Sequence, residues 1–179
     1  TTAPFNYMPN AGSSIIDPFT IETLLQTGSV TINTASGSNA QNGGTIHIID
    51  PINPVNNAAV GLTFIADNQI IVDAEVGGFS LRAPLDITMD ADNGVQIGPN
   101  GFIASGGGSV TIRGDADNNG TGDVTQQASI QTRGGEILIT GHDVFAQQFI
   151  SSGGADIMID ALNDVLLGDS IRADDTSDG

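Results

Sequence analysis

The chain has 179 residues, which suits a single domain, and its 21 acidic side chains outnumber its 4 basic ones. The net charge of −17 excludes nucleic-acid binding through Lys and Arg and disfavours docking on an anionic membrane surface. The lack of cysteine excludes disulfides, thiolate zinc sites and a cysteine nucleophile. No apolar run of about 18 residues occurs, so we expect no membrane insertion, and we expect any export signal to lie outside this stretch.

The composition favours an all-β fold. Glycine accounts for 24 of the 179 residues, about twice its average usage, while hydrophobic residues make up 39%. A disordered chain would hold fewer Ile, Val and Leu, so this chain can bury a core. The apolar residues fall in short runs separated by Gly, Asn and Asp, which is typical of strands and turns.

The N-terminal segment differs from the rest of the chain. Residues 1–14 are polar and aperiodic and contain two prolines, which is typical of an extended arm. Residues 20–28 form the one predicted helix, with Thr20 or Asp17 as its N-cap and Gly28 as its C-cap. The apolar face of this helix consists of Ile21, Leu24 and Leu25.

A short repeat then fills most of the chain. A Gly-Gly pair followed directly by an alternating strand occurs four times, beginning at Gly43, Gly107, Gly134 and Gly153. Each unit of about 20 residues holds three short strands with inward apolar residues at alternate positions. Three strands per unit, stacked copy on copy, predict a parallel β-solenoid of about six to seven turns.

The spacing of the repeat predicts which residues stack in successive turns. An isolated isoleucine precedes each of the last three copies, and one more follows them, at spacings of 27, 20 and 21 residues. These isoleucines should form one inward column, which consists of Ile103, Ile130, Ile150 and Ile171. A second column should contain Ile112, Ile139 and Ile159.

One corner explains the longest spacing. From Ile112 to Val124 is 12 residues, whereas from Ile139 to Val144 is 5, so seven extra residues are inserted there. They fall within residues 115–123. An insertion at a corner preserves the stacking, because each turn bonds only to its neighbours.

The inserted residues resemble a calcium-binding loop. Oxygen-bearing residues stand at alternate positions, and Gly120 stands where such a loop turns sharply. The last ligand position would be Gln126 in place of a bidentate Glu, which predicts weak binding. The alternative is an Asp-, Asn- and Gly-rich corner that only forms a turn. The predicted calcium ligands are Asp115, Asp117, Asn119, Thr121 and Asp123.

Catalysis has little support in the sequence, and we assign no catalytic residue and no cofactor other than calcium. His47 occupies an outward strand position and His142 a corner beside Asp143, where a histidine is expected to be a plain surface residue. Polysaccharide lyases with β-helical folds use a Lys or Arg base beside a calcium cluster. This chain has four scattered Arg and no Lys, so it is predicted not to be an enzyme.

Two segments, residues 21–32 and 62–70, together with the Asp- and Gly-rich corners at 89–92 and 115–123, resemble a known family. They are similar to the repeat region of filamentous haemagglutinin-like adhesins, which Gram-negative bacteria export by two-partner secretion. The resemblance covers about residues 21–173. It implies a right-handed parallel β-helix at the cell surface, without catalysis.

We therefore expect an arm or cap over residues 1–20, a parallel β-helix over 21–173 and a flexible acidic tail over 174–179. The expected function is that of a structural and adhesive segment of a secreted bacterial surface protein. Its expected partners are neighbouring repeats or copies, end to end, and a host or surface glycan or protein receptor. The alternatives are a self-assembling extracellular filament subunit joined by strand addition, and a carbohydrate-binding or polysaccharide-lyase β-helix.

Overall fold

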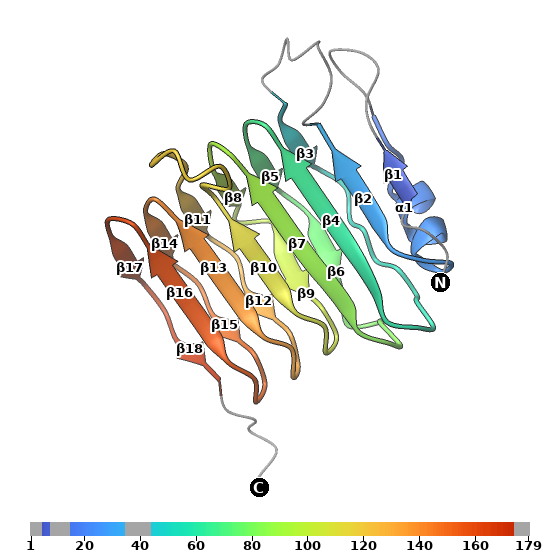
Figure 1. The fold of residues 1–179 in the computed structure, drawn as a ribbon. Helices are drawn as coiled ribbons and strands as arrows, with labels where there is room; N and C mark the ends of the chain where they lie inside the picture. Colours follow the sequence, from blue (N-terminus) through green and yellow to red (C-terminus); the bar gives the residue numbers. More distant parts are fainter. Residues whose placement is uncertain (1–4, 8–14, 35–43, 174–179) are drawn as a thin grey trace, which may run out of the picture.

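The computed structural model describes residues 5–7, 15–34 and 44–173. These residues wind into a right-handed parallel β-helix that advances from the N-terminal to the C-terminal end (Figure 1). Each full turn contributes one strand to each of three parallel sheets. The predicted all-β fold with three strands per turn and a short N-terminal helix is confirmed.

Within the described residues the sheets hold seven, six and five strands. Sheet A contains β1 (Phe5–Tyr7), β2 (Val30–Asn33), β4 (Val60–Ala66), β7 (Leu85–Ala91), β10 (Val110–Arg113), β13 (Ile137–Gly141) and β16 (Ile157–Ala161). Sheet B contains β3 (Ile46–Ile48), β5 (Ile70–Val72), β8 (Val95–Ile97), β11 (Val124–Gln126), β14 (Val144–Ala146) and β17 (Val165–Leu167). Sheet C contains β6 (Glu75–Gly77), β9 (Phe102–Ala104), β12 (Ile130–Gln131), β15 (Ile150–Ser151) and β18 (Ile171–Arg172).

The described part of the chain therefore forms five complete turns, from β4 to β18. An incomplete turn precedes them, in which β2 and β3 supply two strands and a single bridge from Ile52 to Val76 replaces the third. The count is lower than the expected six to seven turns. The difference lies at the N-terminus, where a helix takes the place of a further turn.

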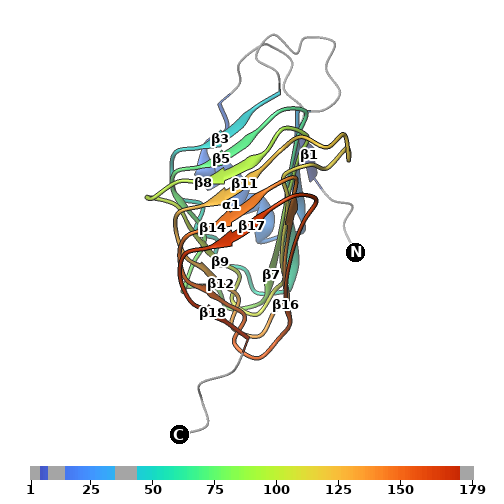
Figure 2. The same cartoon turned by 90° about the vertical axis from the view of Figure 1, so that its left-hand side faces the viewer.

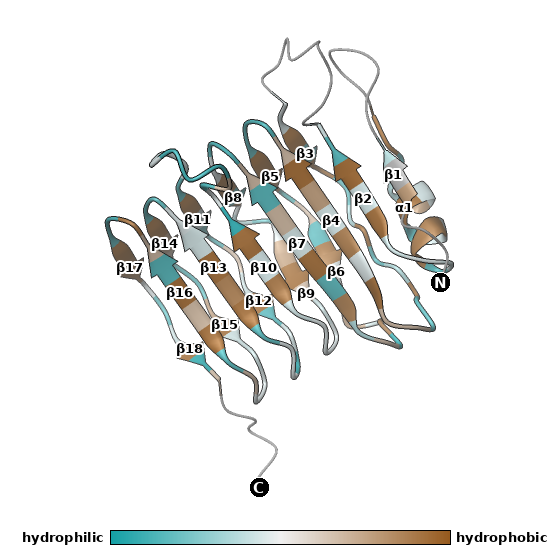
Figure 3. Ribbon diagram, in the orientation of Figure 1, coloured by the Kyte–Doolittle hydropathy of each residue, from teal (hydrophilic) through white to brown (hydrophobic). Residues whose placement is uncertain are grey.

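Both predicted isoleucine columns are present. In sheet C the register pairs Ile130 with Ile103 and Ile150, and Ile150 with Ile171. In sheet A, Ile139 pairs with Ile112 on one side and with Ile159 on the other. Alternate apolar residues of the strands are buried in the core. Figure 3 shows hydrophobic residues along the strands and hydrophilic residues gathered at the corners. Side chains thus fill the interior of the rod.

The repeated Gly-Gly pair has a steric cause. Gly134 has a φ of +115°, a conformation that side chains rarely adopt. A Cβ on Gly135 would lie 1.9 Å from the carbonyl oxygen of Gly108 in the preceding turn. At Gly134 and Gly135, and likewise at Gly107 and Gly108, the first glycine therefore permits the bend between sheets C and A, and the second lets successive turns approach each other. The other two predicted copies are not equivalent to these. Ala155 takes the place of Gly135 in the last copy, and Gly44 precedes β3 of sheet B, not a strand of sheet A.

The N-terminal end of the rod is covered. Helix α1 (Pro18–Leu25) lies inside the outline of the strands when the rod is viewed along its axis (Figure 2), and it buries Ile21 and Leu25. The N-cap is Asp17, whose carboxylate accepts from the Phe19 N–H. Of the two predicted N-caps, Asp17 is therefore confirmed and Thr20 is not. The C-cap is Gln26 and not the expected Gly28.

The expected arm also contains a strand. Residues 5–7 form β1, which pairs in parallel with β2 and thereby extends sheet A at its N-terminal edge. The helix likewise begins within the predicted arm, at Pro18. Residues 1–4, 8–14 and the predicted tail at 174–179 lie outside the described residues.

The C-terminal end is open among the described residues. Val165 and Leu167 continue inward columns of sheet B but remain 47% and 51% exposed. Their counterparts one turn earlier, Val144 and Ala146, are 0% and 2% exposed. The last described turn thus presents an apolar cross-section. No helix among the described residues is both long and apolar enough to cross a bilayer.

Candidate functional site

The corner between sheets A and B carries a ladder of polar side chains, which we call the A/B corner. The Asn68 amide donates to the Thr45 hydroxyl at 3.0 Å, and the Asn93 amide donates to the Asn68 carbonyl oxygen at 3.2 Å. In the following turn, the Thr121 hydroxyl lies 3.4 Å from the side-chain oxygen Oδ1 of Asn93. The inserted loop at residues 115–123 therefore continues a ladder that already exists.

The loop is held closed by its own carboxylates. The two oxygens of Asp115, which is 8% exposed, accept from the backbone N–H groups of Asn119 and Gly120 at 2.9 and 3.1 Å. Asp117 accepts from the side-chain amide of Asn119 at 2.8 Å. The Asn119 side-chain oxygen in turn accepts from the Thr121 N–H at 2.9 Å. These side chains stabilise a turn by satisfying its backbone donors.

The predicted calcium ligands separate into two groups. Asp115, Asp117 and Asn119 bond within the loop, and Thr121 bonds both within it and to Asn93 of the preceding turn, whereas Asp123 faces the following turn. Gln126 does not reach the loop, because its buried side chain bonds to the backbone of Ala128 and Gln148. Calcium binding by these residues stays a prediction, and it would require an ion to compete with the loop's own hydrogen bonds.

Negative charge is crowded along this corner. Partial burial raises the pKa of Asp92, and the nearby carboxylates of Asp117, Asp67 and Asp115 raise it further. These four residues come from three successive turns. The A/B corner is therefore a site where a cation would relieve repulsion.

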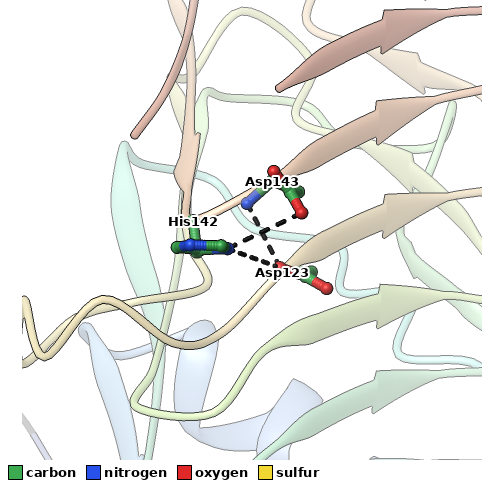
Figure 4. A group of neighbouring side chains, drawn as sticks. All are labelled: Asp123, His142 and Asp143. Atoms are coloured by element: carbon green, nitrogen blue, oxygen red, sulfur yellow. Dashed lines mark hydrogen bonds and ion pairs between the residues drawn. The ribbon is translucent and has the colours of Figure 1, made fainter. Parts of the chain in front are cut away.

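A group with mixed chemistry lies where the loop rejoins the rod (Figure 4). Nδ1 of His142 is 3.5 Å from Oδ1 of Asp123 and 3.6 Å from Oδ2 of Asp143. One ligand atom from each residue lies within 4.8 Å of the other two, and among the described residues only this group of three metal-type ligands does so. We call it the His142 group.

The next turn holds Asp143 in place. Its Oδ1 accepts from the Asn163 amide and from the Asp164 N–H, both at 2.9 Å. The Asp164 N–H and the Asn163 amide lower the pKa of Asp143, and His142 lowers it further. The Asp143 N–H donates to Oδ1 of Asp123 at 3.2 Å, so the backbone links the two carboxylates.

The residue pattern placed His142 only on the surface and missed this group. The strand register could have indicated this group. Val124 pairs with Val144, so the residues directly before them, Asp123 and Asp143, lie at the same place in successive turns. The other histidine forms only a pair: Nε2 of His47 lies 2.7 Å from Oδ2 of Asp73.

An aromatic cluster was also missed, because its members are far apart in the sequence. The rings of Phe79 and Phe102 are 5.2 Å apart between centroids, and the Arg133 guanidinium lies 4.6 Å from the Phe79 centroid. Phe79 is 54% exposed, so this stack lies at the surface. Its geometry fits a cation–π contact that holds the corner between sheets C and A.

Comparison with known proteins found no family model, no curated protein and no solved structure that matches this chain. The fold and the side-chain geometry are therefore the basis for inferring function. The resemblance to filamentous haemagglutinin-like adhesins stays a prediction.

Proposed function

We propose that this chain is a non-enzymatic structural and adhesive segment of a secreted bacterial surface protein. The observation that carries the proposal is the inserted loop on an undisturbed stack. After a corner that holds seven extra residues within 115–123, Val124 still pairs with Val95 and with Val144. A rod that accepts an insertion at a corner without losing register can present contact loops along its length.

The packing of the rod supports the same role. Inward positions such as Ile97, Ile112 and Ile139 are 0% exposed, so side chains fill the interior and leave no room there for a ligand. Contacts with a partner would then use the corners and outer faces. The resemblance in sequence adds the expectation of a location outside a bacterial cell.

Surface labelling tests this proposal on the natural full-length polypeptide. An antibody against this chain should label intact producing cells, and protease treatment of those cells should remove the label. Deletion of residues 44–173 from the polypeptide should reduce attachment of the cells to the host or surface material that they colonise. Labelling only after lysis, or unchanged attachment of the deletion strain, would contradict the proposal.

End-to-end assembly is a second candidate, favoured by the open apolar cross-section of the last turn. Exposed strand edges and exposed apolar residues such as Val165 and Leu167 suit addition of a further strand. Light scattering of the chain should then show growth with concentration, and Leu167→Asp should suppress it. Ile49→Asp is the control, since Ile49 is 65% exposed but lies at the other end of the rod. A monomer at all concentrations, or equal suppression by both variants, would exclude assembly through this face.

A further inference from the structure

We infer that the His142 group is a binding site for a divalent transition-metal ion of the zinc class, held by Asp123, His142 and Asp143. This inference is independent of the adhesive role, and it shares only Asp123 with the predicted calcium loop. The ion would join the inserted loop to the following turn, because Asp123 precedes β11 whereas His142 and Asp143 precede β14.

The spacing of the ligand atoms supports a small ion. Zinc bonds to histidine nitrogen and carboxylate oxygen at about 2.1 Å, which places neighbouring ligands of a tetrahedral shell about 3.4 Å apart. Nδ1 of His142 lies 3.5 and 3.6 Å from its two carboxylate oxygens. Both separations are longer than a good charge-assisted hydrogen bond and close to the edge of a zinc tetrahedron.

The ligand types select the class of ion. One imidazole nitrogen with two carboxylates suits zinc and related first-row ions, whereas calcium and magnesium prefer oxygen ligands only. Three protein ligands would leave the fourth position of a tetrahedral shell for water. The site thus differs in chemistry from the all-oxygen set predicted at residues 115–123, although Asp123 belongs to both.

Outer hydrogen bonds hold the ligands in orientation. The Asn163 amide and the Asp164 N–H both bind Oδ1 of Asp143, so its Oδ2 faces His142. The Asp143 N–H binds Oδ1 of Asp123 and fixes that carboxylate against the next turn. Such second contacts orient the ligands of metal sites and increase their affinity.

The three ligands are also open to solution. The side chains are accessible to an ion from solution, since Asp123 is 49% exposed, His142 35% and Asp143 18%.

The chain offers a matched control for the test. His47 also faces a carboxylate of the next turn, that of Asp73, but it lies in a pair and not in a group of three. Both histidines are partly exposed, so their replacement leaves the core intact. His47→Gln and His142→Gln therefore remove the same chemistry, and only the second removes the proposed site.

The experiment is calorimetric titration of Zn²⁺ into the untagged chain, in a buffer with excess Mg²⁺ that occupies the other carboxylates. Wild type and His47→Gln should bind one Zn²⁺ per chain. His142→Gln should bind at least about 100-fold more weakly, and Asp123→Asn should also bind more weakly while keeping the acceptor for the Asp143 N–H. Circular dichroism confirms that each variant is folded.

Three results would overturn the inference. Zinc binding by His142→Gln with wild-type affinity would show that the ion lies elsewhere. Equal losses in His47→Gln and His142→Gln would show that single histidines bind zinc without a built site. No binding of Zn²⁺ by wild type up to about 1 mM, the weak limit for extracellular ion sites, would exclude the site altogether.

Discussion

Buried hydroxyl groups join successive turns at the corner between sheets C and A. The Thr132 hydroxyl, which is fully buried, lies 3.0 Å from the Ser152 carbonyl oxygen and also contacts that of Gly135. Ser105 and Ser152 occupy the same place in the neighbouring turns and make equivalent contacts. The Ser152 carbonyl oxygen also accepts from the Gly134 N–H, so loss of the Thr132 hydroxyl would remove a donor chiefly from the Gly135 carbonyl oxygen.

Replacing Thr132 with valine tests the importance of this column. Thr132→Val keeps the shape but removes the donor, so the free energy of unfolding should fall by about 1–3 kcal/mol. Chemical denaturation measures this change. Thr111→Val on the outer face of β10 serves as the control and should change stability by less than about 0.5 kcal/mol. Equal effects of the two substitutions would exclude a special role for the buried hydroxyl.

At the scale of one strand, β13 separates the two faces of the rod. Ile139 points inward and is 0% exposed, while its neighbour Leu138 is on the outer face and only partly buried. Ile139→Asp would bury a charge without a partner and should abolish folding, whereas Leu138→Asp should leave a folded chain. Circular dichroism and thermal melting distinguish the two outcomes. A soluble Ile139→Asp variant with unchanged melting would contradict the assigned register.

The strands of the rod could be predicted from the sequence because their apolar pattern is repeated in successive turns. The isoleucine spacings specify register wherever one residue occupies the same place in successive turns, as Ile130 and Ile150 do. The helix boundaries were less certain, because Asp17 and Thr20 are both good N-caps and only packing selects between them. The strand at residues 5–7 was missed because three residues carry no periodicity.

The inserted loop shows why the candidate site was harder to predict. Asp115, Asp117 and Asn119 have oxygens that serve equally well as calcium ligands and as acceptors for the loop's own N–H groups. The sequence pattern is the same in both cases. The His142 group depends instead on contacts between turns, which appear only once the register is combined with side-chain directions.

Calcium binding by the loop nevertheless has a direct test. Affinity should be in the range of about 10⁻⁴–10⁻³ M, and a 100-fold excess over that constant would stabilise the fold by about 2.7 kcal/mol. Thermal melting with and without calcium measures this shift, and Asp117→Asn should lose its calcium-specific part. If calcium shifts wild type and Asp117→Asn equally, the effect is charge screening and the loop is only a turn.

The whole molecule carries a net charge of −17, and part of this charge opposes folding. The pKa of Asp92 is raised, so its ionised form destabilises the fold, and stability should increase as pH falls through that pKa. The lowered pKa of Asp143 acts in the opposite direction: its contribution is complete above the unfolded value of 3.8 and is lost as pH falls through the folded pKa. Stability should therefore be greatest in mildly acidic solution.

Removal of the Asp92 charge distinguishes repulsion at the A/B corner from repulsion over the whole molecule. Asp92→Asn should stabilise the chain at pH 7 by up to about 1 kcal/mol, because the charge is only half-buried and solvent screens it. The gain should shrink as pH falls from 7 through the raised pKa of Asp92, because the wild-type carboxyl then binds a proton in the folded state. Chemical denaturation across this pH range measures it.

Asp160→Asn lowers the net charge equally at an exposed position of β16, away from the crowded corner. Equal gains from both variants would mean that overall repulsion, and not the A/B corner, limits the stability of the rod.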